Sequence, residues 1–295
     1  MLIFAKAMIK LPSTDTPSFI RRNPKFFPFF EDCIGAVDGS HYDSRPPSAY
    51  TEVFRNRKGA ITTNVMTAVD FQGRFIHILP GWEGSAHDWK VYVDAIRRGF
   101  VVPEGKYLLA DAGYNCSHRL LTPYRGIRYH LQETARHGLR PATPEELYNL
   151  RHSQARITVE MALGRHKAMF RILTVRPYFP IRTQVKILYA TAALMNWVID
   201  FGEVESFPVD GEFRIDSDLH VDELANPQPY DTFQDFARSE LDGSDNGQMA
   251  GLRRRIAMLC GHNMRSIWRN RVVHRVVEQI VVCRLHSAAD IWLPG

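Results

Sequence analysis

The chain has 295 residues, of which 45% are hydrophobic and 23% charged, and this composition excludes a collagen-like or wholly disordered protein. No uncharged apolar stretch reaches the roughly 18 residues of a membrane span, and four cysteines without a Cys-x-x-Cys pair argue against a zinc knuckle or a disulfide scaffold. The net charge of +5 divides into +10 for residues 1–200, −11 for residues 201–250 and +6 for residues 251–295. A basic body suits a polyanion such as nucleic acid, although a solvated basic surface explains the charge equally well.

The first 80 residues predict an irregular start followed by three strands. Residues 1–30 contain scattered prolines and predict an irregular lead-in. Residues 33–37 form a short apolar run, typical of a buried strand, and the Asp38-Gly39 pair that follows predicts a turn. Residues 61–69 and 74–79 are rich in β-branched and aromatic residues, and the sequence between them predicts a hairpin.

Helices and short strands follow this hairpin. Residues 85–98 predict a helix in which Ser85 is the N-cap and Asp88, three residues on, completes a capping-box-like pair. We further expect strands at residues 107–110 and 127–131, and helices over residues 145–170 and 185–199.

This succession predicts a mixed α/β fold, a central sheet covered by helices, as one domain over residues 31–200. Residues 201–250 are acidic and poor in aliphatic side chains, so we expect a disordered linker there. Residues 251–295 regain apolar residues and predict a small helical segment.

Two acids follow the predicted buried strands. Asp38 comes after the first strand, and Asp111 comes after the strand at residues 107–110. If these strands are parallel neighbours, both carboxylates lie at one edge of the sheet, where ligands bind in open α/β folds. Each acid alone is explained equally well by an Asx-turn. Two acids so placed favour a metal site.

A third acid, Glu160, lies among apolar residues of the predicted long helix. A lone glutamate on a helix is usually solvated or paired four residues away, here with Arg156. Together with Asp38 and Asp111 it would provide three oxygen ligands, which favour Mg²⁺ or Mn²⁺ over zinc. Two such ions can activate water or a 3′-hydroxyl in phosphodiester chemistry.

Seven short segments resemble, in the same order, the DDE endonucleases of PIF/Harbinger transposons. Each segment alone is weakly specific, but their collinear order over residues 23–199 makes the resemblance strong. The segments are GAVDGSH at 35–41, FRNRKG at 54–59, GWEGSAHD at 81–88, KYLLADAGY at 106–114, PYRG at 123–126, NLRHS at 149–153 and RITVEMALGRHK at 156–167.

The resemblance implies an RNase H-like fold with Asp38, Asp111 and Glu160 as the catalytic triad. It also carries a metal-ligand role onto Asp88, for which a helix-capping role remains the alternative. The family further implies DNA as substrate, a nuclear location, and a Myb/SANT-like DNA-binding partner protein encoded by the same element. The sequence leaves the oligomeric state open.

Basic residues beside these motifs are candidate DNA contacts. Three of them precede the strand at residues 61–69, and three more flank Glu160 on the long helix. Such side chains grip phosphates without regard to sequence, although a solvated loop explains the first group equally well. The candidates are Arg55, Arg57, Lys58, Arg156, Arg165 and Lys167.

The sequence therefore predicts a metal-dependent DNA endonuclease that cuts transposon ends and transfers the freed 3′-hydroxyl strand to target DNA. The alternative is a domesticated, catalytically silent descendant that binds DNA or chromatin. Two features keep that alternative open, the acidic segment at residues 201–250 and the short lead-in where family members often carry a helix-turn-helix region.

Overall fold

A five-stranded mixed sheet in the order β3-β2-β1-β4-β5 forms the centre of the computed structural model, which describes residues 2–127, 141–202 and 247–262. β1, β2 and β3 are antiparallel neighbours, whereas β4 runs parallel to β1 and to β5. The strands are β1 (Cys33–Asp43), β2 (Thr62–Val69), β3 (Phe75–Glu83), β4 (Tyr107–Leu109) and β5 (Leu120–Leu121).

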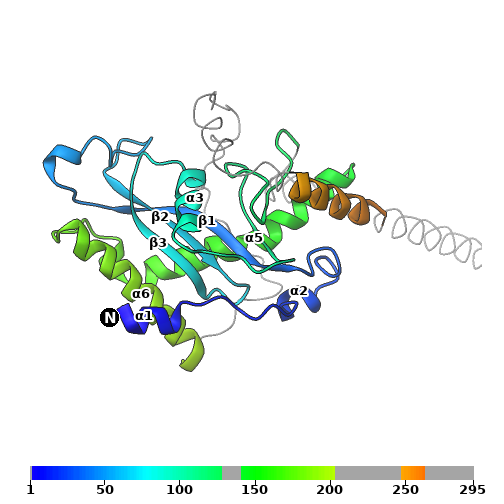
Figure 1. Cartoon of the computed structure of the whole chain (residues 1–295), viewed down its shortest axis with the longest axis horizontal. Helices are drawn as coiled ribbons and strands as arrows, with labels where there is room; N and C mark the ends of the chain where they lie inside the picture. Colours follow the sequence, from blue (N-terminus) through cyan, green and yellow to red (C-terminus); the bar gives the residue numbers. More distant parts are fainter. Residues whose placement is uncertain (1, 128–140, 203–246, 263–295) are drawn as a thin grey trace, which may run out of the picture.

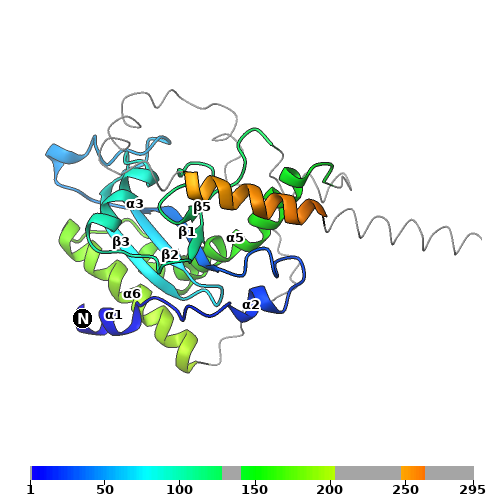
Figure 2. The ribbon, with the colours of Figure 1, turned by 45° about the vertical axis from the view of Figure 1, so that its right-hand side comes forward.

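Helices cover both faces of this sheet (Figures 1 and 2). Helix α3 (Asp88–Arg97) packs on one face, and α5 (Pro144–Met169) and α6 (Ile181–Phe201) pack on the other. The short elements are α1 (Leu2–Met8), α2 (Ser18–Arg21) and the 3₁₀ turns at Ser48–Tyr50 and Arg171–Leu173. None of the helices in the described ranges combines the length and the apolar character that crossing a bilayer requires.

The strand β2 shows why the sheet has two hydrophobic cores. All eight of its residues are buried, as expected for a central strand with helices on both sides. Val65 and Val69 face the core under α5 and α6, whereas Met66 and Ala68 face the core under α3. The period of two along the strand thus divides its apolar residues between the two layers.

The hairpin predicted from residues 61–79 is confirmed, and its turn is held by one side chain. Asp70 Oδ1 accepts hydrogen bonds from the backbone N–H groups of Gln72 at 2.8 Å and Arg74 at 3.0 Å. Gly73 adopts a φ of 79°, which an L-residue rarely tolerates. The turn residues therefore fix the register of β2 against β3.

Long helix α5 begins where its sequence provides caps for the first turn. Thr143 Oγ1 accepts a 3.1 Å hydrogen bond from the N–H of Glu146, and Pro144 occupies the first helical position. The Glu146 carboxylate in turn accepts a 2.7 Å hydrogen bond from the N–H of Ala142. This cap sets the start of the helix that later presents Arg156 and Glu160 to the sheet.

The predicted mixed α/β fold with helices on both faces is confirmed, and so are the helices near residues 145–170 and 185–199. The RNase H-like assignment stays a prediction. The strand expected at residues 127–131 lies outside the described residues except for Ile127, and the acidic segment at 203–246 lies outside them entirely.

Two expectations about the elements were wrong, and one short strand was not predicted. Residues 1–30 are not irregular throughout, because they contain α1 and α2 and bury Phe26 and Phe30 in the core under α5. The strand β1 does not end before Asp38 but continues to Asp43, because β2 pairs with it over that length. The two-residue strand β5 was not anticipated, since only its pairing with β4 defines it.

Residues 247–262 form a helix that packs on the main domain, in agreement with the helical segment predicted from residue 251 onward. Residues 263–295 of that prediction lie outside the described residues. Met249, Ile256 and Cys260 of the helix are buried in the same core as α5 and α6. Arg253 lies 4.4 Å above the ring of Tyr124 and donates a 3.2 Å hydrogen bond to the carbonyl of Pro123. This helix therefore completes one wall of the fold, although the linker before it lies outside the described residues.

Candidate active site

The first two predicted site residues lie on neighbouring parallel strands. Ala36 of β1 is paired in register with Leu109 of β4. Asp38 and Asp111 each follow these partners by two residues, so the register brings both carboxylates to the same region of the sheet. Asp111 lies just past the end of its strand, whereas Asp38 is an interior residue of β1.

The two Asx-turn alternatives have different outcomes. Asp111 Oδ1 accepts a 2.8 Å hydrogen bond from the N–H of Gly113, two residues on, so a turn does form there. Asp38 Oδ1 accepts only from the N–H of Gly39, at 2.9 Å, within a continuing strand. A turn therefore does not account for Asp38, and its largely buried carboxylate needs another explanation.

A third acid, Asp88, comes from α3, which packs on the face of the sheet opposite to α5. It is the first residue of α3, and its Oδ1 accepts a 2.8 Å hydrogen bond from Asn64 Nδ2 of β2. Its carboxylate also lies against Gly39, so closely that a Cβ at that position would overlap Asp88 Oδ1. The glycine after Asp38 is thus required for the close approach of the Asp88 carboxylate to the backbone of β1.

The predicted N-cap at Ser85 was wrong. The N-cap of α3 is His87, whose side chain makes no capping hydrogen bond. Asp88 is hydrogen-bonded to Asn64 of the sheet. The Ser-x-x-Asp spacing matches that of a capping box. In the structure, Ser85 lies in the turn before α3 and Asp88 is the first residue of the helix.

Arg156 connects Asp38 with Glu160. Its Nη1 donates to Asp38 Oδ2 at 3.2 Å, and its Nη2 donates to Glu160 Oε1 one helical turn further along α5. The Arg156 side chain is only 11% exposed, against 18% for Asp38 and 23% for Glu160. The pairing of Glu160 with Arg156, expected from their spacing, therefore forms in a largely buried place.

We call Asp38, Asp88, Asp111 and Glu160 the carboxylate cluster. The pKa of Asp38 is raised to about 8, chiefly by burial and also by the negative charges of Asp111, Glu160 and Asp88, against the lowering effect of Arg156. Arg156 is thus one cation among four acids. The site has an excess of negative charge of the kind that binds a cation.

Sequence reasoning missed Tyr114, which lies three residues after Asp111. Its side chain is fully buried, and its hydroxyl has no hydrogen-bond partner among the described residues. Burial raises the pKa of Tyr114 well above its usual range, and the charges of Asp88, Asp38 and Asp111 act in the same direction. The Gly-Tyr after Asp111 was the only sequence signal, and an aromatic residue after a turn usually indicates core packing.

The carboxylate cluster has suitable donors for a divalent cation. Hard cations such as Mg²⁺ and Mn²⁺ prefer carboxylate oxygens, and the buried Asp38 lies in the field of three further acids. In the described part of the chain, however, no three acidic, histidine or cysteine side chains stand close enough together to hold a metal ion. The donor chemistry fits, while Arg156 occupies two of the carboxylates in this arrangement.

The basic loop before β2 is partly neutralised by its own residues. Arg55 makes a two-pronged ion pair with Glu52, with Nε–Oε2 and Nη2–Oε1 distances of 3.1 and 2.8 Å. Its Nη1 also donates to the carbonyl of Gly59 at 2.9 Å. Arg55 therefore shapes the loop, the exposed Arg57 places its Nη2 2.9 Å from His87 Nδ1, and Lys58 is exposed.

The remaining predicted DNA contacts lie on α5 in different settings. Arg156 is largely buried in the carboxylate cluster, where its guanidinium is paired with Asp38 and Glu160, and its role as a DNA contact stays a prediction. Lys167 donates a 3.1 Å hydrogen bond to the carbonyl of His41 and lies 4.7 Å above the ring of Tyr42. Burial lowers the pKa of Lys167. Arg165 is partly exposed on the same helix.

Comparison with known proteins agrees with the resemblance read from the seven segments. Residues 37–196, more than half of the chain, match the family model described as DDE superfamily endonuclease. "Protein ALP1-like" from Arabidopsis thaliana is 27% identical over 191 residues, covering 57% of this chain and 43% of that protein. "Putative nuclease HARBI1" from Rattus norvegicus is 30% identical over 186 residues, covering 60% and 49% respectively.

The chain spans about half the length of these curated relatives, and no solved structure matches it. The matched region begins one residue before Asp38 and extends past Glu160, so it contains the whole carboxylate cluster. The predicted resemblance is therefore confirmed, and the chain belongs to the DDE superfamily endonuclease family.

Proposed function

We propose that this protein is a divalent-metal-dependent DNA endonuclease whose catalytic groups are Asp38, Asp111 and Glu160. The observation that carries the proposal is the carboxylate cluster, in which two strands of the sheet and two helices bring four acids into one electrostatic site. Buried acids without compensating cations are costly in a fold, so such an excess is typical of a functional site.

Asp38, Asp88, Asp111 and Glu160 would hold Mg²⁺ or Mn²⁺. When bound, the metal supplies Lewis acidity toward a phosphodiester and an activated water. The chain itself contributes the positions of the carboxylates. Asn64 orients Asp88, the N–H of Gly113 orients Asp111, and the strand register keeps Asp38 beside Asp111.

DNA is the substrate that this chemistry implies, and the exposed basic side chains would hold its backbone. Arg57, Lys58 and Arg165 are the candidates, because they are at least partly exposed on the loop before β2 and on α5. Arg57 and Lys167 already have partners, since the Arg57 guanidinium is bonded to His87 and the Lys167 ammonium contacts His41 and Tyr42. Contacts of this kind give salt-sensitive affinity that does not depend on sequence.

The wider proposal is that cleavage occurs at transposon ends and that the freed 3′-hydroxyl attacks target DNA. A Myb/SANT-like partner would then supply site-specific binding, and the protein would act in the nucleus. The support for these parts is membership of the family and the similarity to relatives such as the putative nuclease of rat.

Nicking of supercoiled plasmid by the purified protein tests the endonuclease function. The reactions contain Mg²⁺, Mn²⁺ or EDTA, and compare wild type with Asp38→Asn and Glu160→Gln. The matched control is Asp43→Asn, which removes an exposed carboxylate from the same strand. We expect metal-dependent nicking that both cluster variants lose and the control retains.

The same assay separates the enzyme from a DNA-binding descendant. Wild type that binds DNA in a gel-shift assay but never nicks it, with either metal, contradicts the endonuclease and supports the silent binding protein. Equal nicking by wild type and Asp38→Asn would assign cleavage to other residues.

A further inference from the structure

We propose that Arg156 is an internal counter-ion that takes the place of a divalent cation between Asp38 and Glu160 and has to leave them when the cation binds. The inference rests on the proposed metal-dependent function and adds to it the residue that sets the affinity for metal. It starts from the bonds of one guanidinium to carboxylates of two separate elements.

The position of Arg156 joins the sheet to the helix through charge. Asp38 belongs to β1 and Glu160 to α5, and their side chains meet only through the guanidinium between them. The planar fork of arginine can donate to two acids at once, which a lysine ammonium does less well. Without a cation at this place, two largely buried carboxylates would face each other unpaired.

Each of the two carboxylate oxygens of Asp38 accepts a hydrogen bond in this arrangement. Oδ1 accepts from the N–H of Gly39 at 2.9 Å, and Oδ2 accepts from Arg156 at 3.2 Å. Asp88 and Asp111 each give one oxygen to a protein donor as well, Asn64 and Gly113 respectively. A metal ion bound through Asp38 Oδ2 therefore competes directly with the guanidinium of Arg156.

The spread of the carboxylates agrees with this view. A guanidinium is far larger than Mg²⁺, which needs its oxygen ligands at about 2.1 Å. No three acidic, histidine or cysteine side chains in the described ranges stand close enough to hold a metal ion. The cluster is thus arranged around the arginine, and it has to contract when a smaller and more highly charged cation replaces it.

The other cation near the cluster does not have this role. The ammonium of Lys167 is influenced by the charge of Asp38, but it donates to the carbonyl of His41 and lies above the ring of Tyr42. Arg156, in contrast, makes ion pairs with two members of the carboxylate cluster, Asp38 and Glu160. Its removal should therefore change metal affinity most.

The test is a Mn²⁺ titration of the full chain, with free Mn²⁺ measured by electron paramagnetic resonance. Wild type is compared with Arg156→Gln and with the control Arg171→Gln, which removes the same charge from an exposed residue just past α5. Because a charge repelling the metal is removed, we expect Arg156→Gln to bind Mn²⁺ at least about ten-fold more tightly. The control should match wild type.

A second measurement follows thermal unfolding with EDTA and with Mn²⁺. We expect Arg156→Gln to melt at a lower temperature than wild type in EDTA and to gain more from added Mn²⁺. If Arg156→Gln does not fold, Arg156→Lys replaces it, because a lysine keeps the charge but loses the fork. A Mn²⁺ affinity of this variant about three-fold above wild type is then expected.

The outcomes separate the inference from the proposed function. Wild type that binds Mn²⁺ while Arg156→Gln binds it equally or more weakly overturns the role of Arg156 and leaves the metal-dependent function in place. If neither wild type nor the variants bind Mn²⁺ at millimolar concentration, the metal-dependent function and the inference both fail.

Discussion

Helix α5 carries two polar clusters against the same sheet, and they are built on opposite principles. The first is Arg156 and Glu160 with Asp38, which is charged and contains more acids than cations. The second lies further along the helix, where buried His166 contacts Tyr42 of β1 and Thr191 of α6. Both are buried and both connect α5 to other elements, yet only the first has an unbalanced charge.

The His166 cluster is neutral and its hydrogen bonds are complete. Thr191 Oγ1 donates to the carbonyl of Ile187 at 2.9 Å, so its oxygen accepts from His166 Nε2, also at 2.9 Å. His166 Nδ1 is then the acceptor for the Tyr42 hydroxyl at 3.1 Å. Burial lowers the pKa of His166 to about 4, which agrees with this neutral form.

The comparison teaches how to distinguish a structural polar cluster from a functional one in this fold. The His166 cluster satisfies each of its groups with another, which holds α5, α6 and β1 in position. The carboxylate cluster leaves an excess of charge that the protein alone does not balance. Stability should therefore depend on the His166 cluster and activity on the carboxylate cluster.

The largest expected effect is that of Asp38→Asn. We predict a loss of nicking by at least about 10³-fold, since a neutral amide is a poor ligand for a hard cation. The same variant should be more stable than wild type by about 1 kcal/mol or more at pH 8, as is common when a strained functional site is neutralised. Nicking rates and urea unfolding measure the two effects.

The pH dependence gives the sign of this stabilisation. The folded pKa of Asp38 is raised to about 8 from 3.8, so the folded state binds the extra proton between these values. The contribution of Asp38 to stability is thus present at low pH and is lost as pH rises through about 8. An Asp38→Asn variant that is less stable than wild type at every pH contradicts the comparison.

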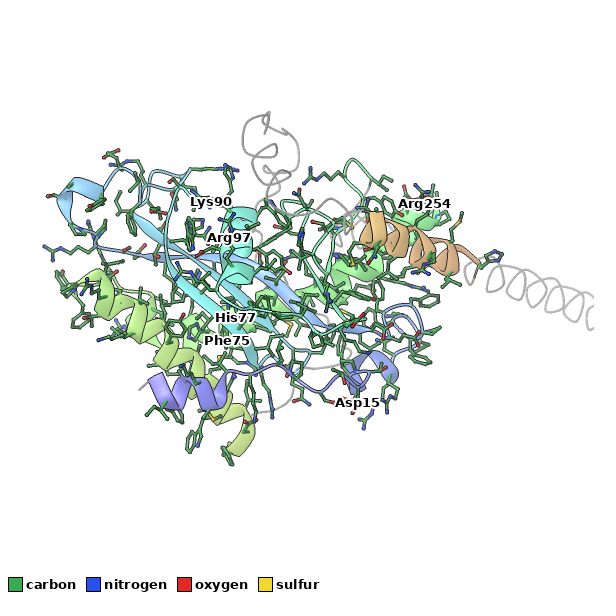
Figure 3. The ribbon with its side chains drawn as sticks, in the orientation of Figure 1. Asp15, Phe75, His77, Lys90, Arg97 and Arg254 are labelled. Carbon is green, nitrogen blue, oxygen red and sulfur yellow. The ribbon has the colours of Figure 1, made fainter. Side chains whose placement is uncertain are left out.

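The next effect is that of His166→Leu. We predict a loss of about 2–3 kcal/mol of folding free energy, because the Tyr42 hydroxyl loses its buried partner and the imidazole contacts with Phe75 disappear. Figure 3 labels Phe75 on β3, whose ring lies 4.9 Å from that of His166. Nicking per folded molecule should be unchanged, and a nicking loss like that of Asp38→Asn would end the distinction between the clusters.

Acid unfolding provides a smaller effect that isolates the same histidine. Because the folded pKa of His166 is about 4 and the unfolded value is 6.5, the unfolded state binds more protons in this window. Stability is therefore lost as pH falls from 6.5 to 4, by up to about 1.4 kcal/mol per pH unit for one group.

Urea unfolding of wild type and His166→Leu at pH 7, 6 and 5 measures this contribution. The difference between their slopes isolates His166 from His77 and His152, whose pKa values burial lowers to about 4 and about 3. Parallel slopes for the two proteins would mean that His166 is not buried in the neutral form.

Sequence reasoning anticipated the sheet and the proximity of the acids for a physical reason. Apolar runs of strand length predicted β1 and β4, and their parallel pairing brings Asp38 and Asp111 to one edge. The predictions from sequence were wrong where contacts between distant parts of the chain determine the local structure. Asp38-Gly39 predicts a turn locally, but pairing with β2 keeps it extended, and Gly39 makes room for Asp88 instead.

The position of Arg156 shows the same limit. The spacing of Arg156 and Glu160 predicts their pairing on the helix, and the basic residues around Glu160 predicted a DNA-binding face. Only the fold shows that this turn of α5 lies against β1, where Asp38 shares the guanidinium. Local pattern thus predicted which acids lie near one another, whereas the arginine paired with two of them required the tertiary structure.

The smallest predicted effect comes from removing a tyrosine hydroxyl, once in the His166 cluster and once beside the carboxylate cluster. Tyr42→Phe removes a hydroxyl that is bonded to His166, so we expect a loss of about 1 kcal/mol of folding free energy. Tyr114→Phe removes a fully buried hydroxyl that has no partner among the described residues and faces the field of the cluster acids. Here we expect no loss, or a gain of up to about 1 kcal/mol. Urea unfolding at pH 7 compares the two variants. An equal loss of folding free energy in both would mean that the Tyr114 hydroxyl is hydrogen-bonded to the carboxylate cluster. The polar groups of that cluster would then be satisfied by one another, as those of the His166 cluster are.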